Sequence, residues 1–502
     1  MTASTRSKSA LRFAKLIAPY DSRNSRRVAH APPARVGTVP GMIDLDVARD
    51  GTDDQRLGTR AAASTSHSLS HGAGVALFGW CGLVVVGYLL VRDALGASVL
   101  SLHDAAPLYA TFDPRITVWV VVVIGCAWLG VTRGPRLACA LSWRRLLWTS
   151  WGAAAVWAAA LAATRGTGRI TAVFERNGEY LAVLPSVHSV GAFLDQYVAR
   201  IRSFPVHVQG HPPGFVLVAW ALERVGLGGS FPASVLCITV GAAAIPAVLV
   251  TVRAVAGADR ARRAAPFLVL APFAISIATS ADAFFAGVGA WAVALVVVAT
   301  GRRDRRGDAS AVVGGVLFGV TAFLSYGLVL LAVIPLVVAL QRRRVRPLLL
   351  AAFGALPVFA AFALAGFWWV DGLLATRRQY FVGIASYRPY GVYVIANFAA
   401  FAIIVGPAVA PALVRLRDRR LWLVVGAALL AVALADVSGM SKAEVERIWL
   451  PFAPFVLAAT AALSAGATTV QGVVRVPRSL AAWIALQAGF TIFLEALVRT
   501  GW

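Results

Sequence analysis

The segment GVALFGWCGLVVVGYLLVRDA (residues 74–94) is the first of a series of long apolar runs, and these runs decide the fold class. An apolar run of about 20 residues, folded as a helix, is long enough to cross the hydrocarbon core of a bilayer. The runs are continuous, whereas the strands of a membrane barrel alternate between apolar and polar residues, so helices are predicted. With 59% hydrophobic and 14% charged residues, the composition is not that of a soluble protein. We therefore predict an all-α polytopic membrane protein.

The net charge of +24 comes from arginines that fall in short clusters between the apolar runs. Such clusters are typical of cytoplasmic loops. A nucleic-acid-binding face would interleave basic with aromatic residues, so no nucleic-acid partner is expected. The cysteines lie in or beside apolar runs and lack metal-ligand spacing, so neither disulfides nor a metal site is expected. They are Cys81, Cys126, Cys139 and Cys237.

Residues 1–70 are rich in Arg, Ser, Ala and Pro and show no apolar period. This composition predicts a disordered, basic cytoplasmic tail, followed by a multi-pass transmembrane domain over residues 71–502. No early apolar stretch adjoins a small-residue cleavage site, so no removable signal peptide is expected. The predicted location is the cell membrane, with the N-terminus in the cytoplasm and the lipid bilayer as a partner.

Placing the arginine-rich loops in the cytoplasm predicts crossings near 74–94, 115–133 and 147–163, and it leaves residues 164–212 outside. The later clusters RRDRR, RRRVR and RLRDRR then send residues 368–390 to the same external side, together with residues 436–448. About 13 crossings are predicted, with the C-terminus external.

Two intervals do not follow this scheme. Residues 213–226 and 231–251 both resemble spans, yet two crossings would put the basic RARR at 260–263 outside. Either one of the two is short or re-entrant, or this loop breaks the charge rule. The interval 309–340 is long for one span and short for two, and its glycines, among them Gly315, offer a break.

The external segment 164–212 concentrates residues that could carry chemistry. If residues 171–180 are helical, Glu175 and Glu179 share a face, and their mutual repulsion favours one of them as a base. The stretch GAFLDQYVARIRSF (191–204) predicts a juxtamembrane helix whose arginines pair with a lipid-linked phosphate or with anionic headgroups. Amphipathic helices at the membrane surface would explain both patterns without chemistry. The catalytic candidates are Glu175, Glu179 and Asp195, and the substrate-binding candidates are Arg176, Arg200, Arg202, His207 and His211.

The most specific element is VQGHPPGFVLVAWAL (208–222), in which a histidine and two prolines precede an apolar helix. Pro213 is tolerated near a helix start because the first-turn donors are unpaired there, and Gly214 lets the backbone approach another element closely. His211 is then expected at a helix mouth, at the boundary between water and membrane.

The order of these parts resembles the GT-C membrane glycosyltransferases, a family that includes protein O-mannosyltransferases, aminoarabinose transferases and actinobacterial arabinosyl- and mannosyltransferases. A span is followed by a long acidic external loop, by HPP at the start of the next helix, by the turn GLGGS, and by SADAFF, which carries Asp282. The similarity covers residues 147–300. Asp282 is a further binding candidate because a carboxylate at membrane depth is costly.

The resemblance implies that an acidic residue of the first external loop is the base toward an acceptor hydroxyl, and that a polyprenyl-phosphate-linked sugar is the donor. ERNGEY (175–180) offers two such residues, Glu175 and Glu179. A lipid phosphate is a good leaving group, so a base and cations that hold the phosphate suffice. No nucleotide-binding Gly-rich loop is required, and a divalent metal helps some members of the family. The acceptor would be a glycan, lipid or protein of the cell envelope.

Two further external segments offer cations and aromatic side chains. ATRRQYFVGIASYRPYGVY (375–393) contains Arg377, Tyr380 and Arg388, which suit sugar stacking and phosphate pairing. ADVSGMSKAEVERIWLPFAP (435–454) contains Arg447, which is similar to an arginine found late in several of these transferases. An interfacial aromatic belt and a salt-bridged surface turn would explain the same residues.

The leading hypothesis is therefore a glycosyltransferase that acts at the external face. The alternative is a transporter or flippase of an anionic or lipid-linked substrate, in which the arginines line a path. The charges gather mainly at one face, whereas transport needs polar groups on both sides of a site at the membrane midplane. A noncatalytic assembly protein, for which no external carboxylate would matter, is the third hypothesis.

Overall fold

A computed structural model of the protein describes residues 72–94, 108, 111–278, 280–464, 468–470, 473–475 and 477–499. The tail predicted over residues 1–70 lies outside these residues. Within them the chain is almost entirely helical, and its few strands form two short antiparallel pairs, β1 (Thr111–Phe112) with β4 (Val498–Arg499) and β2 (Thr468–Val470) with β3 (Val473–Arg475). The all-α prediction is confirmed for this part of the chain.

Nine helices of the described part are long and apolar enough to cross a membrane. They are Gly72–Ala94, α2 (Val118–Ala140), α3 (Trp143–Ala163), α8 with α9 (Ser230–Ala242 and Ala244–Ala256), α12 (Asp282–Thr300), α13 (Arg305–Leu324), α15 (Arg346–Leu364), α19 (Arg419–Val437) and α22 (Arg478–Leu497). The pair α17 (Tyr390–Val405) and α18 (Val409–Arg415) is bent by 93° and would make a tenth. A multi-pass membrane protein fits these helices.

Shorter elements complete the bundle. Two stretches are apolar but below the length of a full span: η4 with α14 (Tyr326–Ala332 and Val333–Gln341), and α21 with η6 (Ala453–Leu457 and Ala458–Ser464). The others are α4 (Arg169–Ala172), η2 (Tyr180–Ser186), α5 (Val190–Gln196), η3 (Ile201–Ser203), α6 (Val206–Gly210), α7 (Gly214–Arg224), α10 (Ala258–Val269), α11 (Ala274–Ile277), α16 (Trp369–Val382), η5 (Ile384–Tyr387) and α20 (Val445–Ile448).

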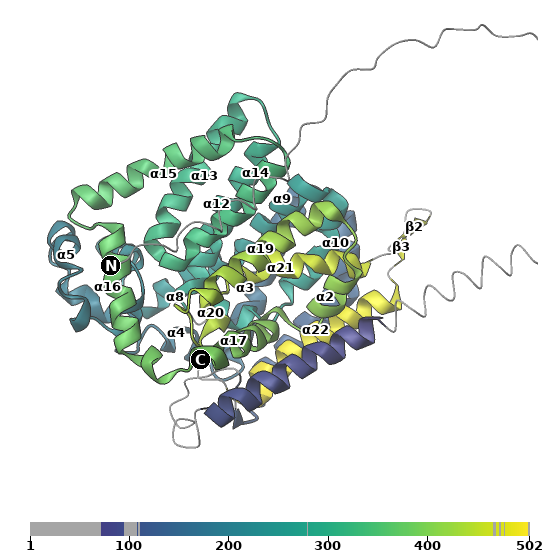
Figure 1. Cartoon of the computed structure of the whole chain (residues 1–502). Coiled ribbons are helices and arrows are strands. Elements are labelled where there is room, and N and C mark those ends of the chain that lie inside the picture. The colour runs from purple at the N-terminus through teal and green to yellow at the C-terminus, as the bar shows by residue number, and fades with distance from the viewer. Residues whose placement is uncertain are drawn as a thin grey trace, which may run out of the picture. The chain divides into compact units, whose positions relative to one another are not determined.

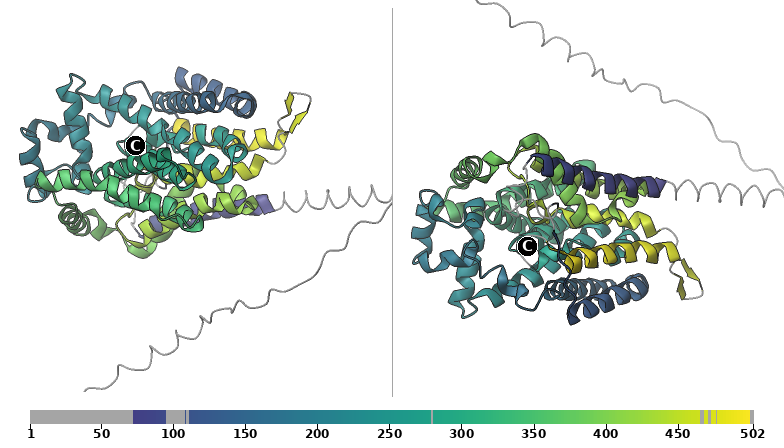
Figure 2. Two further views of the ribbon diagram at one scale, coloured as in Figure 1. Left: turned by 90° about the horizontal axis from the view of Figure 1, so that it is seen from above. Right: turned by 90° about the horizontal axis from the view of Figure 1, so that it is seen from below.

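Helix α12 forms the centre of the bundle, where it packs against α8, α9 and α13 (Figure 1). Its residues are mostly buried, whereas α15 and Gly72–Ala94 bury only a small share of theirs, as helices that face lipid would. Both views in Figure 2 show α22 between α2 and Gly72–Ala94, and the β2–β3 hairpin extends beyond the helices. A central helix buried over most of its surface holds its N-terminal residue in a fixed position.

The lengths of the helices explain the two intervals, 213–251 and 309–340, that do not follow the predicted scheme of crossings. Helix α7 has 11 residues, which span only about 16 Å, too little for the hydrocarbon core, whereas Ser230–Ala256 is long enough. In the second interval the expected glycine break is wrong, because α13 runs unbroken to Leu324. Gly315 instead lets α15 approach, since a Cβ there would lie 2.0 Å from the Ala351 carbonyl oxygen.

The arginine-rich turns contact one another at one end of the bundle. The guanidinium of Arg342 donates to Thr300 Oγ1 at 2.7 Å, and that of Arg344 donates to the carbonyl of Arg302 at 2.8 Å. Arg262 reaches the carbonyl of Leu141 at 2.9 Å, and Arg260 pairs with Asp418 at 3.0 Å. Helix α12 begins at Asp282 and ends at Thr300, so the 19 residues between these points separate its two ends by about 28 Å, close to the thickness of a hydrocarbon core.

Candidate functional site

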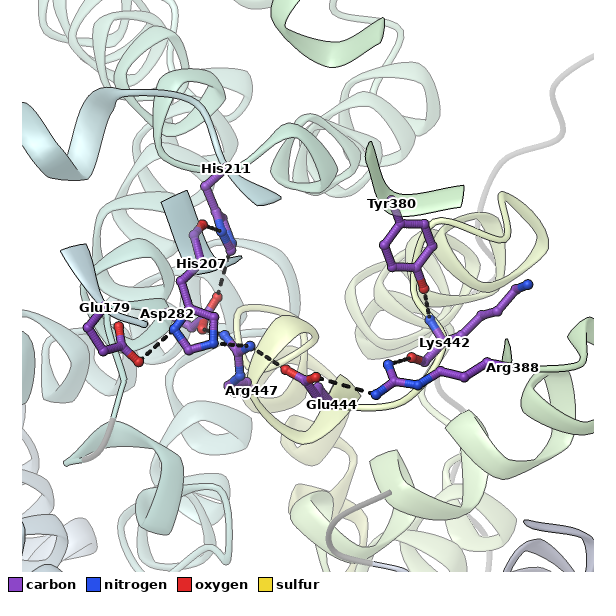
Figure 3. A network of polar contacts seen from close by, with 9 residues as sticks. All are labelled: Glu179, His207, His211, Asp282, Tyr380, Arg388, Lys442, Glu444 and Arg447. Carbon is purple, nitrogen blue, oxygen red and sulfur yellow. Dashed lines mark hydrogen bonds and ion pairs between the residues drawn. The ribbon is translucent and has the colours of Figure 1, made fainter. Parts of the chain in front are cut away.

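A chain of polar contacts surrounds the N-terminus of α12 (Figure 3). Glu179 Oε1 lies 2.6 Å from His207 Nδ1, and Arg447 Nη2 lies 3.1 Å from His207 Nε2. Arg447 also donates through Nη1 to Asp282 Oδ2 at 3.0 Å and through Nη2 to Glu444 Oε2. These five residues, together with His211, Arg388, Lys442 and Tyr380, are here named the polar network.

The contacts of His207 assign its tautomer. An arginine guanidinium can only donate, so Nε2 of His207 must accept from Arg447. The ring proton then lies on Nδ1 and is donated to the Glu179 carboxylate. Glu179 is buried, with an exposed fraction of 4%, so its carboxyl group has little contact with bulk water. The hydrogen bond from His207 fixes its orientation.

His211 is positioned by its own loop. Its Nδ1–H donates to the carbonyl of His207 at 2.8 Å, and its Nε2 lies 3.9 Å from Asp282 Oδ1. The hydroxyl of Tyr197 lies 2.7 Å from the carbonyl of Val208 and 2.9 Å from that of His211, which ties the loop to α5 and its following turn. Burial lowers the pKa of His211 despite the nearby Asp282, so the ring is neutral and Nε2 carries a lone pair at neutral pH.

The start of α7 determines where this loop sits. Pro213 is the N-cap and Gly214 the first helical residue, as the sequence predicts. A Cβ on Gly214 would lie 2.2 Å from the Phe323 carbonyl oxygen, so the close approach expected of this glycine is confirmed. The ring of Phe285 lies 5.6 Å from that of His211 and shields it from water.

Asp282 and Arg447 form the buried ion pair at the centre. Asp282 is the first residue of α12, where the helix dipole favours a negative charge, and its exposed fraction is 3%. Burial alone would lower the pKa of Arg447, but Glu444 and Asp282 raise it above its ordinary value. Burial likewise opposes the charge of Glu444, yet Arg447 and Arg388 hold its pKa below the ordinary value. Arg447 and Glu444 are therefore both charged.

The segment before α20 carries the remaining contacts. Its backbone is held by side chains, since the N–H of Lys442 donates to the hydroxyl of Tyr380 at 2.7 Å and the N–H of Ala443 donates to Asn397 Oδ1 at 3.1 Å. Arg388 donates through Nη1 to the carbonyl of Lys442, and its Nη2 lies 3.6 Å from Glu444 Oε1. Burial raises the pKa of Tyr380 to about 12, so its phenol keeps its proton.

The structure brings six of the residues predicted from the sequence into the polar network. They are Glu179, His207, His211, Asp282, Arg388 and Arg447. The other six are exposed and lie outside it. They are Glu175, Arg176, Asp195, Arg200, Arg202 and Arg377.

The helix considered for residues 171–180 does not form, because α4 ends at Ala172 and turns follow. Glu175 and Glu179 consequently do not share a helical face. Glu175 is exposed and accepts a hydrogen bond from the hydroxyl of Ser230 at 3.0 Å, whereas Glu179 faces His207. The juxtamembrane helix expected over 191–204 is also interrupted, since α5 ends at Gln196 and only the short η3 follows.

Sequence reasoning placed Tyr380 among suitable residues but selected neither Lys442 nor Glu444 as a site residue. The available signal was the density of charged residues between Asp436 and Arg447, directly before an apolar run. That signal identifies the segment but not its members, because a charged turn at the surface has the same composition.

Within the described residues, no group of three or more His, Cys, Asp or Glu side chains is arranged to hold a metal ion. Comparison of the chain with protein-family models, with curated proteins and with solved structures finds no match. The function is therefore inferred from the charge, burial and contacts of the polar network.

Proposed function

We propose that the protein is a membrane glycosyltransferase that transfers a sugar from a polyprenyl-phosphate donor to an acceptor of the cell envelope at the external face. The observation that carries the proposal is the polar network itself. It places a buried carboxylate, Glu179, in the same chain of contacts as two buried guanidiniums, Arg447 and Arg388. A base and a phosphate-binding pair are what this reaction requires.

The roles follow from charge and burial. The acceptor oxygen forms a bond to the anomeric carbon, the bond from that carbon to the phosphate oxygen breaks, and the phosphate leaves with the bonding electrons. Glu179 takes the hydroxyl proton, and His207 orients this carboxylate through Nδ1–H. Arg447 and Arg388 stabilise the charge that develops on the leaving phosphate, because guanidiniums pair well with phosphate oxygens.

The proposed orientation puts the arginine-rich end of the bundle in the cytoplasm and the polar network outside. The count of thirteen crossings is reached when four further stretches are added to the nine long helices. These stretches are the bent pair α17–α18, α10 with α11, η4 with α14, and α21 with η6. The external C-terminus follows from this odd number. The contacts among the arginine-rich turns support the arrangement, since they gather all these turns at one end.

The alternative of a lipid transporter has one observation in its favour. A groove of about 760 Å³ lies between α3, α8, α9 and α12, with Arg144 near the arginine-rich end. Its other lining residues are almost all apolar, including Trp148 and Trp291. Such a groove can hold a lipid chain but offers little to a polar headgroup that must cross, so the transferase is favoured.

The test compares two carboxylates of the same loop. Membranes that contain Glu179→Gln should lose transfer from labelled polyprenyl-phosphate sugars at unchanged protein level, by about 100-fold or more, as is typical when a general base is removed. Glu175→Gln is the matched control, because Glu175 is exposed and outside the polar network, and it should transfer at close to the wild-type rate. Equal transfer by both variants would exclude Glu179 as the base.

A transporter would behave differently in the same preparation. Movement of the labelled lipid between leaflets of reconstituted vesicles, without sugar transfer to any acceptor, would replace the transferase proposal with the alternative.

A further inference from the structure

Glu444 occupies the position between the two guanidiniums of the polar network. One carboxylate oxygen, Oε2, accepts from Arg447, and the other, Oε1, lies 3.6 Å from Arg388 Nη2. A phosphate that binds two arginines at once would use the same donors. The carboxylate and a phosphate would also repel each other at this separation, so they cannot occupy the guanidinium pair together.

The two arginines do not depend on Glu444 for their positions. Arg447 is also held by Asp282 at 3.0 Å and by His207 at 3.1 Å. Arg388 is also held by the carbonyl of Lys442, and its guanidinium lies 6.0 Å from the centre of the Tyr393 ring. If Glu444 moved away, both guanidiniums would keep contacts that fix their orientation.

Glu444 is the member of this trio that can move. Its side chain is 23% exposed, whereas those of Arg388 and Arg447 are 4% and 9% exposed. A carboxylate at the surface of the trio can rotate into water, where its charge is solvated, whereas a buried guanidinium cannot.

The backbone around Glu444 is held in a demanding conformation. Ala443 and Glu444 both have left-handed backbone angles, with φ of 66° and 59°, which non-glycine residues rarely adopt. Such strain persists only where surrounding contacts impose it, and here the hydrogen bonds that the backbone N–H groups of Ala443 and Lys442 donate to Asn397 and Tyr380 do so. The consequence is that the Glu444 carboxylate is aimed at the two arginines.

We propose that Glu444 is a displaceable internal ligand of the Arg388–Arg447 pair, which the phosphate of a polyprenyl-phosphate ligand replaces when it binds. This inference rests on the proposed function, because it takes the same arginines as the phosphate site. In addition, the affinity of the Arg388–Arg447 pair for phosphate is set by competition with the Glu444 carboxylate. A weakened affinity would help a phosphate product to leave.

The test is the affinity of purified protein in detergent for geranylgeranyl phosphate, with inorganic phosphate and geranylgeraniol as separate probes. Glu444→Gln removes the competing charge and should bind geranylgeranyl phosphate about fivefold or more tightly than the wild type, at the lower end of usual coupling between two ligands. Affinity for geranylgeraniol, which lacks phosphate, should not change. If Glu444→Gln gains as much affinity for inorganic phosphate, the site recognises the phosphate group alone. If only the affinity for geranylgeranyl phosphate rises, the lipid chain also contributes to binding. Both results support displacement.

Glu175→Gln is the charge-matched control, since it removes one negative charge from an exposed position outside the polar network and should leave all affinities unchanged. Equal or weaker phosphate binding by Glu444→Gln would overturn displacement and make Glu444 a structural partner of the arginines. If this variant does not accumulate, Glu444→Asp, whose charge remains but reaches the pair less well, should show a smaller gain in the same direction. Failure of both variants to fold would also overturn the proposal. Sugar transfer is measured independently, so tighter binding without transfer would refute the transferase and retain the displacement.

Discussion

At the scale of single residues, burial separates side chains that have the same chemistry. Glu175 and Glu179 are four residues apart, yet one is exposed and the other is buried against His207. Arg447 and Arg388 differ from Arg377 in the same way. A buried ionised group needs partners, and those partners assign its protonation and its orientation.

His211 leads to a prediction about pH. Burial lowers its pKa in the folded state, whereas the unfolded chain takes up a proton near the ordinary value of 6.5. The unfolded state therefore binds more protons between these two pKa values, and the stability contributed by neutral His211 is complete above pH 6.5 and is lost as the pH falls through the lowered pKa.

His211→Gln removes this titration while it keeps a side chain that can hydrogen-bond. Its melting temperature in detergent should fall less between pH 7.5 and pH 5.5 than that of the wild type. The matched control is His188→Gln, because His188 is exposed and its replacement should leave the pH dependence as it is in the wild type. An identical fall in His211→Gln and wild type would show that folding does not lower the pKa of His211.

At the scale of elements, close backbone approach positions the site. Helix α7 begins at Gly214 directly against the end of α13, and α13 packs on α15 through Gly315 and Gly354. Helices in membranes associate through such small residues because lipid offers no hydrophobic driving force between them. The loop that carries His207 and His211 is thereby fixed to the centre of the bundle.

Gly214→Ala should destabilise the protein. Its Cβ would meet the Phe323 carbonyl oxygen at 2.2 Å, so α7 must shift, at a cost of about 1–3 kcal/mol for an overpacked core. The melting temperature and the rate of sugar transfer should both fall, because His211 moves with α7.

Gly210→Ala serves as the control for this substitution. Gly210 lies one turn before α7, and a Cβ there would meet no atom within 4 Å. Its replacement should leave stability unchanged or slightly raised, since alanine is the better helix former. If the two variants melt alike, the contact between α7 and α13 does not limit stability.

At the scale of the whole molecule, charge is sorted to the two ends of the bundle. The arginine-rich turns share contacts at one end of α12, and the polar network surrounds its other end, about 28 Å away by helix length. This separation matches a hydrocarbon core and is the basis for the proposed orientation.

Labelling of single cysteines would test that orientation. In a variant without the natural cysteines, Glu175→Cys should react with a membrane-impermeant maleimide on intact cells, because its position is exposed near the polar network. Arg303→Cys, at the arginine-rich end, should react only after the cells are opened. The reverse pattern would place the polar network in the cytoplasm and remove the basis for an external transferase.

Helices and a membrane environment could be predicted from the amino-acid sequence alone, because apolar run length and local backbone hydrogen bonding decide both properties within each segment. The sequence also identified the four segments that carry the polar network, the segment of Asp282 among them, and the helix start at Gly214. Which charged residues meet depends on the folded arrangement, since Arg447 contacts Asp282 and His207 across 165 and 240 residues of sequence. Burial of Glu179, exposure of Glu175 and the position of Glu444 between two arginines depend on how distant helices pack, and no local pattern encodes that packing.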